Sequence, residues 1–96
     1  MLILITYDVS TQTAEGKRRL RHVAKKCLAY GQRVQNSVFE CNLDWSQYLK
    51  LQSELKSIIK TEEDSLRFYN LSNEYSKRIV HIGVKPSIDL EGDLIV

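Results

Sequence analysis

Blocks of apolar and polar positions along the chain predict where its helices and strands lie. The run LILITYDV, residues 2–9, is mostly apolar and rich in β-branched side chains, which predicts a central strand buried on both faces. The polar stretch STQTAEGK follows with helix-start signals, and apolar residues then recur at helical spacing as far as Leu28. These patterns predict a first helix that ends at Gly31.

The segment after Gly31 has room for two short strands and a tight turn. We expect strands over residues 32–35 and 38–42, with a turn between them. Asp44 then provides an N-cap, and Gln47 stands three residues further on, as in a capping box. A second helix is therefore expected to begin there.

The remaining pattern predicts strands over residues 65–72 and 78–83, separated by a loop. The order of elements is then β-α-β-β-α-β plus an extra strand near the C-terminus. This is the ferredoxin-like split βαβ arrangement of an α+β domain. We assign residues 1–82 to this domain and residues 83–96 to a C-terminal extension.

The size of the chain and the character of its tail both favour a homodimer. A chain of 96 residues buries only about two-thirds of its unfolded surface, so its stability is marginal unless something adds to it. The tail is mostly polar yet ends in Leu-Ile-Val, whereas a chain end normally frays. If residues 83–96 added a strand to the sheet of a partner subunit, these apolar side chains would be covered.

The composition is that of a soluble globular protein, which we expect in the cytoplasm. Hydrophobic residues make up 43% and charged residues 27%, and no apolar run approaches the roughly 20 residues that a membrane span needs. The N-terminal run lacks a basic segment and contains Asp8, so it is not expected to be a signal peptide. Cys27 and Cys41 have no CxxC spacing and no nearby pair of histidines, so we expect reduced, buried thiols and not a metal site.

Positive charge gathers in one segment, although the net charge is only +2. Residues 17–26, KRRLRHVAKK, contain six lysines and arginines and no acidic residue. On the predicted first helix they form a basic surface that suits a polyanion such as nucleic acid. A solvated helix face is the alternative, and charge alone does not decide between the two.

Asp8 is the main candidate for chemistry, because it stands where the first strand ends. An unpaired carboxylate is costly to bury, so a core position is not expected, and capping the next loop is the alternative role. One Asp alone makes a poor Mg²⁺ site. A two-fold dimer would place Asp8 opposite its copy, and two carboxylates with water molecules could then hold one ion. Such an ion would activate water for attack on a phosphodiester.

Three stretches, in this order, resemble the Cas2 family, the small CRISPR-associated proteins of spacer acquisition. They are ITYDV at residues 5–9, RVQNSVFE at residues 33–40, and the C-terminal HIGVKPSIDLEGDLIV, which resembles the subgroup of type I-C systems. The resemblance covers essentially the whole chain. It implies a ferredoxin-like homodimer in which the C-terminal strand of one subunit joins the sheet of the other.

The resemblance also implies a set of site residues. Asp8 matches the family's metal-binding Asp, paired across the dimer axis, with Mg²⁺ or Mn²⁺ as cofactor. Tyr7 and Ser37 match neighbours of that Asp and are predicted to be catalytic with it, although core packing and a turn are their ordinary roles. Together with the basic helix, the resemblance predicts these nucleic-acid contacts: Arg18, Arg19, Arg21, Lys25, Arg33 and Phe39. No motif fixes the register on the helix, so which of Arg18, Arg19 and Arg21 matches the family's arginine stays open. We expect Arg33 to lie beside Asp8 and to reach a phosphate, whereas packing is the alternative for Phe39.

Two functions follow from the resemblance. The first is a Mg²⁺-dependent endonuclease that acts on RNA or double-stranded DNA through Asp8. The second is a non-catalytic scaffold that holds a protospacer duplex between dimers of the Cas1 integrase, a role that does not need Asp8. A single-strand RNA-binding module of the same element order is disfavoured, because SVFEC at residues 37–41 lacks that motif's glycines and paired aromatics. Neither His22 nor His81 has an evident partner, so no His-based acid–base chemistry is expected.

Overall fold

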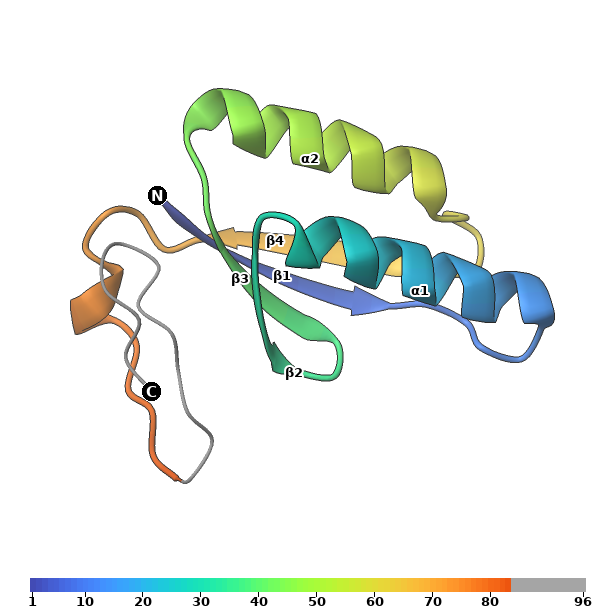
Figure 1. The fold of residues 1–96 in the computed structure, drawn as a ribbon, viewed down its shortest axis with the longest axis horizontal. Coiled ribbons are helices and arrows are strands. Elements are labelled where there is room, and N and C mark those ends of the chain that lie inside the picture. The colour runs from blue at the N-terminus through green and yellow to red at the C-terminus, as the bar shows by residue number, and fades with distance from the viewer. Residues whose placement is uncertain (84–96) are drawn as a thin grey trace.

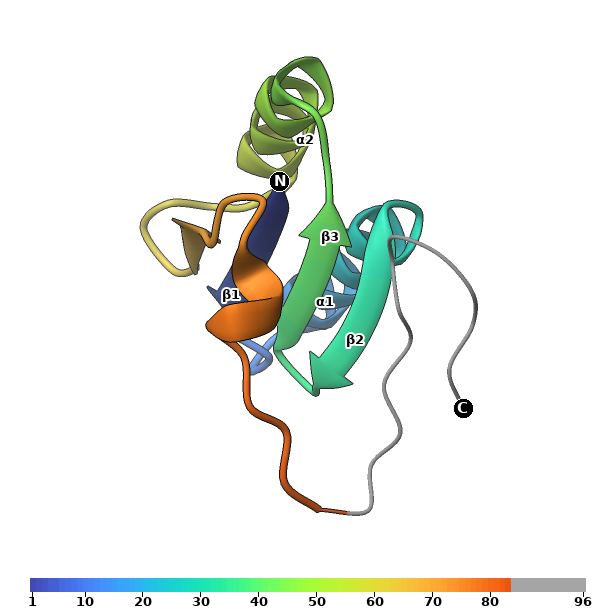
Figure 2. The ribbon, with the colours of Figure 1, turned by 90° about the vertical axis from the view of Figure 1, so that its left-hand side faces the viewer.

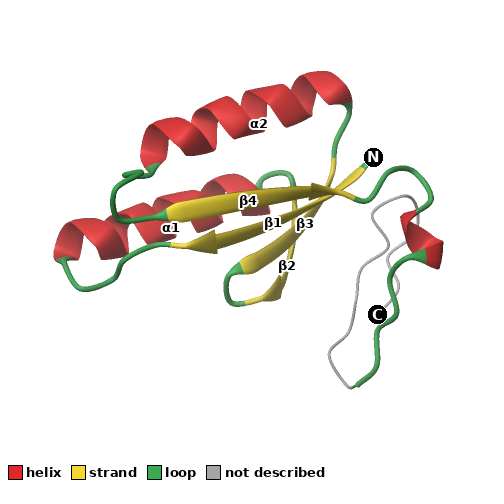
Figure 3. Ribbon diagram, turned by 180° about the vertical axis from the view of Figure 1, so that it is seen from behind, coloured by secondary structure: helices red, strands yellow, loops and turns green. Residues whose placement is uncertain are grey.

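The computed structural model describes residues 1–83, which form a four-stranded antiparallel sheet with two helices on one face (Figure 1, Figure 3). The elements in chain order are β1 (Leu2–Asp8), α1 (Ala14–Leu28), β2 (Gly31–Gln35), β3 (Val38–Asn42), α2 (Trp45–Ile58), β4 (Ser65–Asn70) and the 3₁₀ helix η1 (Tyr75–Lys77). The strand order across the sheet is β2-β3-β1-β4. The α+β, ferredoxin-like fold predicted from the sequence is confirmed.

The core lies between the sheet and the helices. Alternate side chains of β1 and β3 point toward the helices and are buried: Ile3, Ile5, Tyr7, Phe39 and Cys41. The helices close this layer with Val23, Ala24, Cys27, Leu51 and Leu55. The prediction of reduced, buried thiols is confirmed for Cys27 and Cys41, and burial raises the pKa of each thiol to about 12. None of the helices within residues 1–83 is long and apolar enough to cross a membrane.

Helix α2 begins as the sequence predicted. Asp44 Oδ1 accepts a hydrogen bond from Gln47 N at 2.7 Å, and Gln47 Oε1 accepts one from Asp44 N at 3.0 Å. We expect Asp44→Ala to lower the free energy of unfolding by about 1 kcal/mol, because the first-turn N–H loses its acceptor. Urea denaturation measures this loss, with Asp44→Asn as the control that retains a cap. An Ala variant as stable as the parent would contradict the prediction.

The prediction of a strand over residues 78–83 is wrong. Residues 75–77 form η1, where a loop was expected, and residues 79–83 continue without strand structure (Figure 2). A strand needs a neighbouring strand for its backbone groups, and none in the described part of the chain pairs with this segment. Val80 and Ile82 are consequently 81% and 90% exposed. Of the extension predicted over residues 83–96, the structure describes only Gly83. The strand that the extension is predicted to add therefore lies outside the described residues.

The face of the sheet opposite the helices carries no helix within residues 1–83 (Figure 3). On this open face, Leu4, Thr6 and Val38 line a hollow of about 560 Å³. Residues 80–82 border the same hollow. The sheet therefore has a packed helix side and an accessible open face, and the two offer different environments to functional side chains.

Candidate functional site

Asp8 ends β1 at a place where two other segments approach. It stands opposite Ser65, the first residue of β4. The preceding residue, Tyr7, donates its backbone N–H to the carbonyl of Ser37 at 3.1 Å, which brings the β2–β3 turn alongside. The predicted proximity of Ser37 to this end of β1 is therefore present, and a catalytic role for Ser37 stays a prediction.

The Asp8 side chain lies on the open face of the sheet. Side chains alternate along a strand, and because Tyr7 is buried toward the helices, Asp8 faces the other way. It is exposed, and within residues 1–83 its carboxylate has no hydrogen-bond or ion-pair partner. No group of three or more His, Cys, Asp or Glu side chains that could hold a metal occurs in this part of the chain. Asp8 thus fits one oxygen ligand of a divalent ion, and further ligands must come from elsewhere.

Tyr7 and Phe39 form a stacked pair on the helix side, with ring centroids 5.7 Å apart. The Tyr7 hydroxyl donates to the carbonyl of Asn36 at 3.3 Å. Burial raises the pKa of Tyr7, and the nearby Arg33 guanidinium opposes part of that rise. These contacts give Tyr7 a packing role, and its catalytic role remains a prediction. Phe39 is 0% exposed, so its ring belongs to the core, contrary to the predicted contact with nucleic acid.

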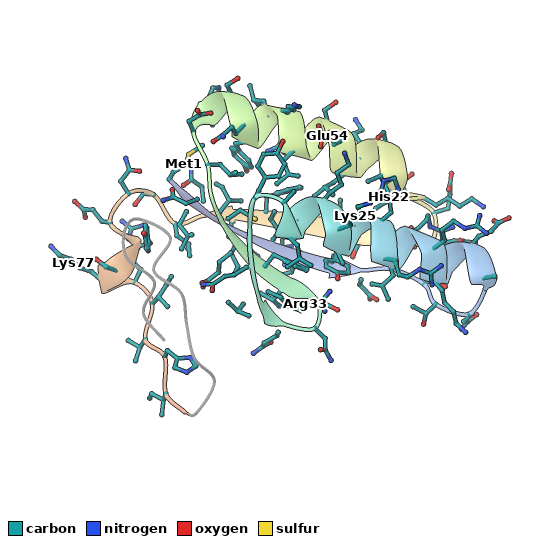
Figure 4. All side chains as sticks on the ribbon, in the orientation of Figure 1. Met1, His22, Lys25, Arg33, Glu54 and Lys77 are labelled. Atoms are coloured by element: carbon teal, nitrogen blue, oxygen red, sulfur yellow. The ribbon has the colours of Figure 1, made fainter. Side chains whose placement is uncertain are left out.

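Arg33 lies on the helix side as well, which differs from the expected position beside Asp8. It is in register with Phe39 on the neighbouring strand, and its Cζ lies 5.2 Å from the centre of that ring. Residues that face each other across two strands share one face of the sheet, whereas Asp8 is on the other. Arg33 is exposed at the β2–β3 hairpin (Figure 4), and its contact with a phosphate stays a prediction.

The basic residues of α1 include an exposed group and residues that are paired with acids, of which Arg19 is the most buried. Arg18, Arg21 and Lys25 are exposed, and Figure 4 shows Lys25 and His22 on this helix. Arg19 is only 14% exposed, and its Nε donates to Asp64 at 2.7 Å while its Nη2 donates to Glu63 at 2.9 Å. Its guanidinium is therefore committed to two carboxylates, contrary to the predicted contact with nucleic acid.

Asp64 is the residue that sequence reasoning missed. Its fully buried carboxylate accepts hydrogen bonds from the backbone N–H groups of Ser10 at 3.0 Å and Lys60 at 2.9 Å, besides the bond from Arg19. Burial alone would raise the pKa of Asp64, but the bonds from Arg19, Lys60 and Ser10 lower it overall. This network ties the α2–β4 loop and α1 to the loop that follows Asp8.

These features define a small ferredoxin-like protein with an exposed acid at the end of its first strand and a basic first helix. The sequence profile of the family described as "CRISPR associated protein Cas2" matches residues 1–79. The chain belongs to the Cas2 family. The resemblance seen in the ITYDV and RVQNSVFE stretches is thereby confirmed, while the type I-C subgroup stays a prediction.

Relatives match along almost the whole chain. A "CRISPR-associated endonuclease Cas2" of Halalkalibacterium halodurans is 60% identical over 95 residues, covering 99% of both chains. A "CRISPR-associated endoribonuclease Cas2" of Chlorobaculum tepidum is 54% identical over 96 residues, covering 100% of both. The crystal structure of Streptococcus pyogenes Cas2 is 48% identical, with a TM-score of 0.77, and the match covers 86% of this chain and 100% of that one.

Proposed function

We propose that the chain is a divalent-metal-dependent endonuclease of CRISPR spacer acquisition that hydrolyses phosphodiester bonds through Asp8. The observation that carries the proposal is the exposed Asp8 carboxylate on the open face at the end of β1, which has no partner within residues 1–83. Two relatives that match over nearly their whole length are named an endonuclease and an endoribonuclease, which supports the same activity here.

The metal site is proposed to form in a homodimer, because residues 1–83 supply one suitable acid at this place and a second carboxylate would complete the pair that often holds Mg²⁺ with water. Asp8 of each copy would be a ligand across the two-fold axis. The open sheet face and the exposed Val80 and Ile82 support pairing with a second copy. Mg²⁺ or Mn²⁺ bound there would lower the pKa of a water and offset charge on the phosphate.

The substrate backbone is proposed to lie against the exposed cations of α1, among them Arg18, Arg21 and Lys25. Phosphate contacts hold a nucleic acid without reading its sequence, so the proposal includes both RNA and double-stranded DNA. The free, buried cysteines Cys27 and Cys41 are compatible with a reducing compartment such as the cytoplasm.

Metal removal tests this proposal. End-labelled double-stranded DNA and single-stranded RNA are incubated with the purified chain in Mg²⁺, in Mn²⁺ and in excess EDTA. We expect one substrate to be cut in the metal buffers and the rate to fall to background in EDTA, since the proposed mechanism activates water through the bound ion. Equal cutting in EDTA and in Mg²⁺ would contradict a metal-dependent mechanism.

A scaffold function is the second candidate, and the placement of the cations favours it. The basic residues of α1 lie on the helix side of the sheet and Asp8 lies on the open face, so duplex binding does not require Asp8. In this role the chain would hold a protospacer duplex between dimers of the Cas1 integrase. Duplex affinity should then fall steeply with salt, and the chain should co-purify with the integrase. Binding insensitive to salt would count against it.

A further inference from the structure

An arginine outside the predicted site shares the open face with Asp8. Strand β4 runs antiparallel to β1, with Arg67 opposite Thr6 and Ser65 opposite Asp8. Residues that face each other across two strands lie on the same side of the sheet, so Arg67 is the diagonal neighbour of Asp8 on the open face. Diagonal neighbours of this kind are about 7–8 Å apart, and their Cβ atoms are somewhat closer, within the reach of an arginine side chain.

The Arg67 guanidinium is exposed and is not neutralised by an acid within residues 1–83. Its Nη1 donates to the hydroxyl of Tyr69 at 3.1 Å, and its Cζ lies 6.0 Å from the centre of the Tyr69 ring. Tyr69 stands opposite Leu4, so this contact holds the cation over the open face, on the side of Arg67 farther from Asp8. To meet a phosphate beside Asp8, the Arg67 side chain would turn toward Ser65. A guanidinium carries five N–H donors, and the Tyr69 hydroxyl takes one of them. Arg67 thus differs from Arg19, whose charge is balanced by two carboxylates.

We infer that Arg67 binds the phosphodiester group that lies beside Asp8, an inference that rests on the proposed function. Arg33, the cation expected in this place, stacks on Phe39 on the other side of the sheet. Arg67 occupies the open face, where a phosphate next to the Asp8 carboxylate would meet a planar donor fork. Charge-assisted bonds of this kind are short and often bidentate, which orients the phosphate as well as attracting it.

The test compares Arg67→Gln and Arg67→Lys with a matched control, Arg78→Gln. Arg78 is an exposed arginine just after η1. It follows the end of β4 that lies opposite Ile3, and Asp8 lies at the other end of β1. We expect Arg67→Gln to lower kcat/KM about 10- to 100-fold, the loss of one charge-assisted phosphate contact. The kcat/KM of Arg67→Lys should lie between those of Arg67→Gln and the parent, because lysine keeps the positive charge but not the paired N–H donors of the guanidinium. Arg78→Gln should stay within about twofold of the parent, as for a surface change away from any site.

A binding measurement in EDTA tests the same residue without turnover. The affinity for a fluorescent nucleic acid duplex is measured over a salt series, and Arg67→Gln should lower the salt slope by about 0.9, the value for one phosphate contact. Sedimentation and circular dichroism establish that dimer and fold are retained. The inference is overturned if Arg67→Gln matches Arg78→Gln in both assays, or if its loss of function accompanies loss of the dimer. A parent that binds but never cuts would contradict the nuclease proposal, while the salt slope would still decide the role of Arg67.

Discussion

Asp8→Ala is expected to abolish metal-dependent cleavage while duplex affinity stays within about twofold of the parent. Loss of an outer partner of a metal ligand typically costs roughly 10–100-fold, so loss of the ligand itself should exceed about 100-fold. The Asp8 side chain is exposed and makes no hydrogen bond or ion pair within residues 1–83, so the variant should be as stable as the parent. The measurement is single-turnover cleavage in Mg²⁺, with binding determined in the same samples.

Retained binding is expected because most of the cations proposed to hold the backbone, those of α1, are not on the face that carries Asp8. Arg18, Arg21 and Lys25 project from α1, which packs on the helix side of the sheet. Removal of the carboxylate also removes a like charge from the neighbourhood of phosphate, which offsets part of the attraction lost with the bound ion. A drop in affinity comparable to the drop in rate would mean that the duplex depends on Asp8 for its position.

Glu62→Ala is the matched control, since it removes the same charge from an exposed acid of the α2–β4 loop. It should cut at the parent's rate. If Asp8→Ala also cuts at that rate, the activity does not pass through Asp8. If neither the parent nor Asp8→Ala cuts beyond background while both bind duplex equally, the scaffold function explains the chain better than the nuclease function does.

The elements that the sequence predicted well are those set by local signals. The capping box of Asp44 and Gln47 involves neighbours three residues apart, so it can be read before the fold is known. The apolar run of β1 likewise predicts a central strand, and β1 does lie between β3 and β4. Its expected burial on both faces is not seen within residues 1–83, where Leu4 and Thr6 are only half-buried. The strand expected over residues 78–83 failed for the opposite reason. Strand structure depends on a pairing partner, and the sequence of a segment does not say whether its own chain supplies one.

The sequence predicted those site features that depend on the place of one residue within its own element, and missed those that depend on contacts between distant segments. Asp8 could be placed at a strand end, but the face occupied by Arg33 depends on its register with Phe39 and on an irregularity between Arg33 and Gln35. Arg19 looked like its neighbours on α1 because its partner Asp64 is 45 positions away. Arg67 was within reach of sequence reasoning. Leu66 and Phe68 are apolar residues on either side of Arg67 in β4, and they pack against the core. Because side chains alternate along a strand, Arg67 is expected on the face of the sheet opposite the core.

Asp64→Asn is expected to destabilise the fold by roughly 3 kcal/mol at pH 7, a large part of the 5–15 kcal/mol typical of a domain. The fully buried carboxylate accepts from Ser10 N, Lys60 N and Arg19, and an amide can replace only part of this acceptor capacity. The estimate lies at the lower end of values for breaking a buried pair, because Glu63 still contacts Arg19. Urea denaturation at one fixed protein concentration measures the change, since any dimer would make stability concentration-dependent.

Glu63→Gln is the control, because it removes the other acid that contacts Arg19 at a side chain that is 44% exposed. We expect the free energy of unfolding to change by less than about 1 kcal/mol, as for surface ion pairs.

The stabilities of the two variants should also respond differently to acid pH. The folded-state pKa of Asp64 lies below its ordinary value of 3.8, so its contribution is complete well above that value and is lost as the pH falls toward the folded-state pKa. The gap between the parent and Asp64→Asn should therefore narrow below about pH 4. A gap that is the same at pH 3 and pH 7 would mean that the ionised carboxylate is not what holds the loop after Asp8 against α1 and the α2–β4 loop.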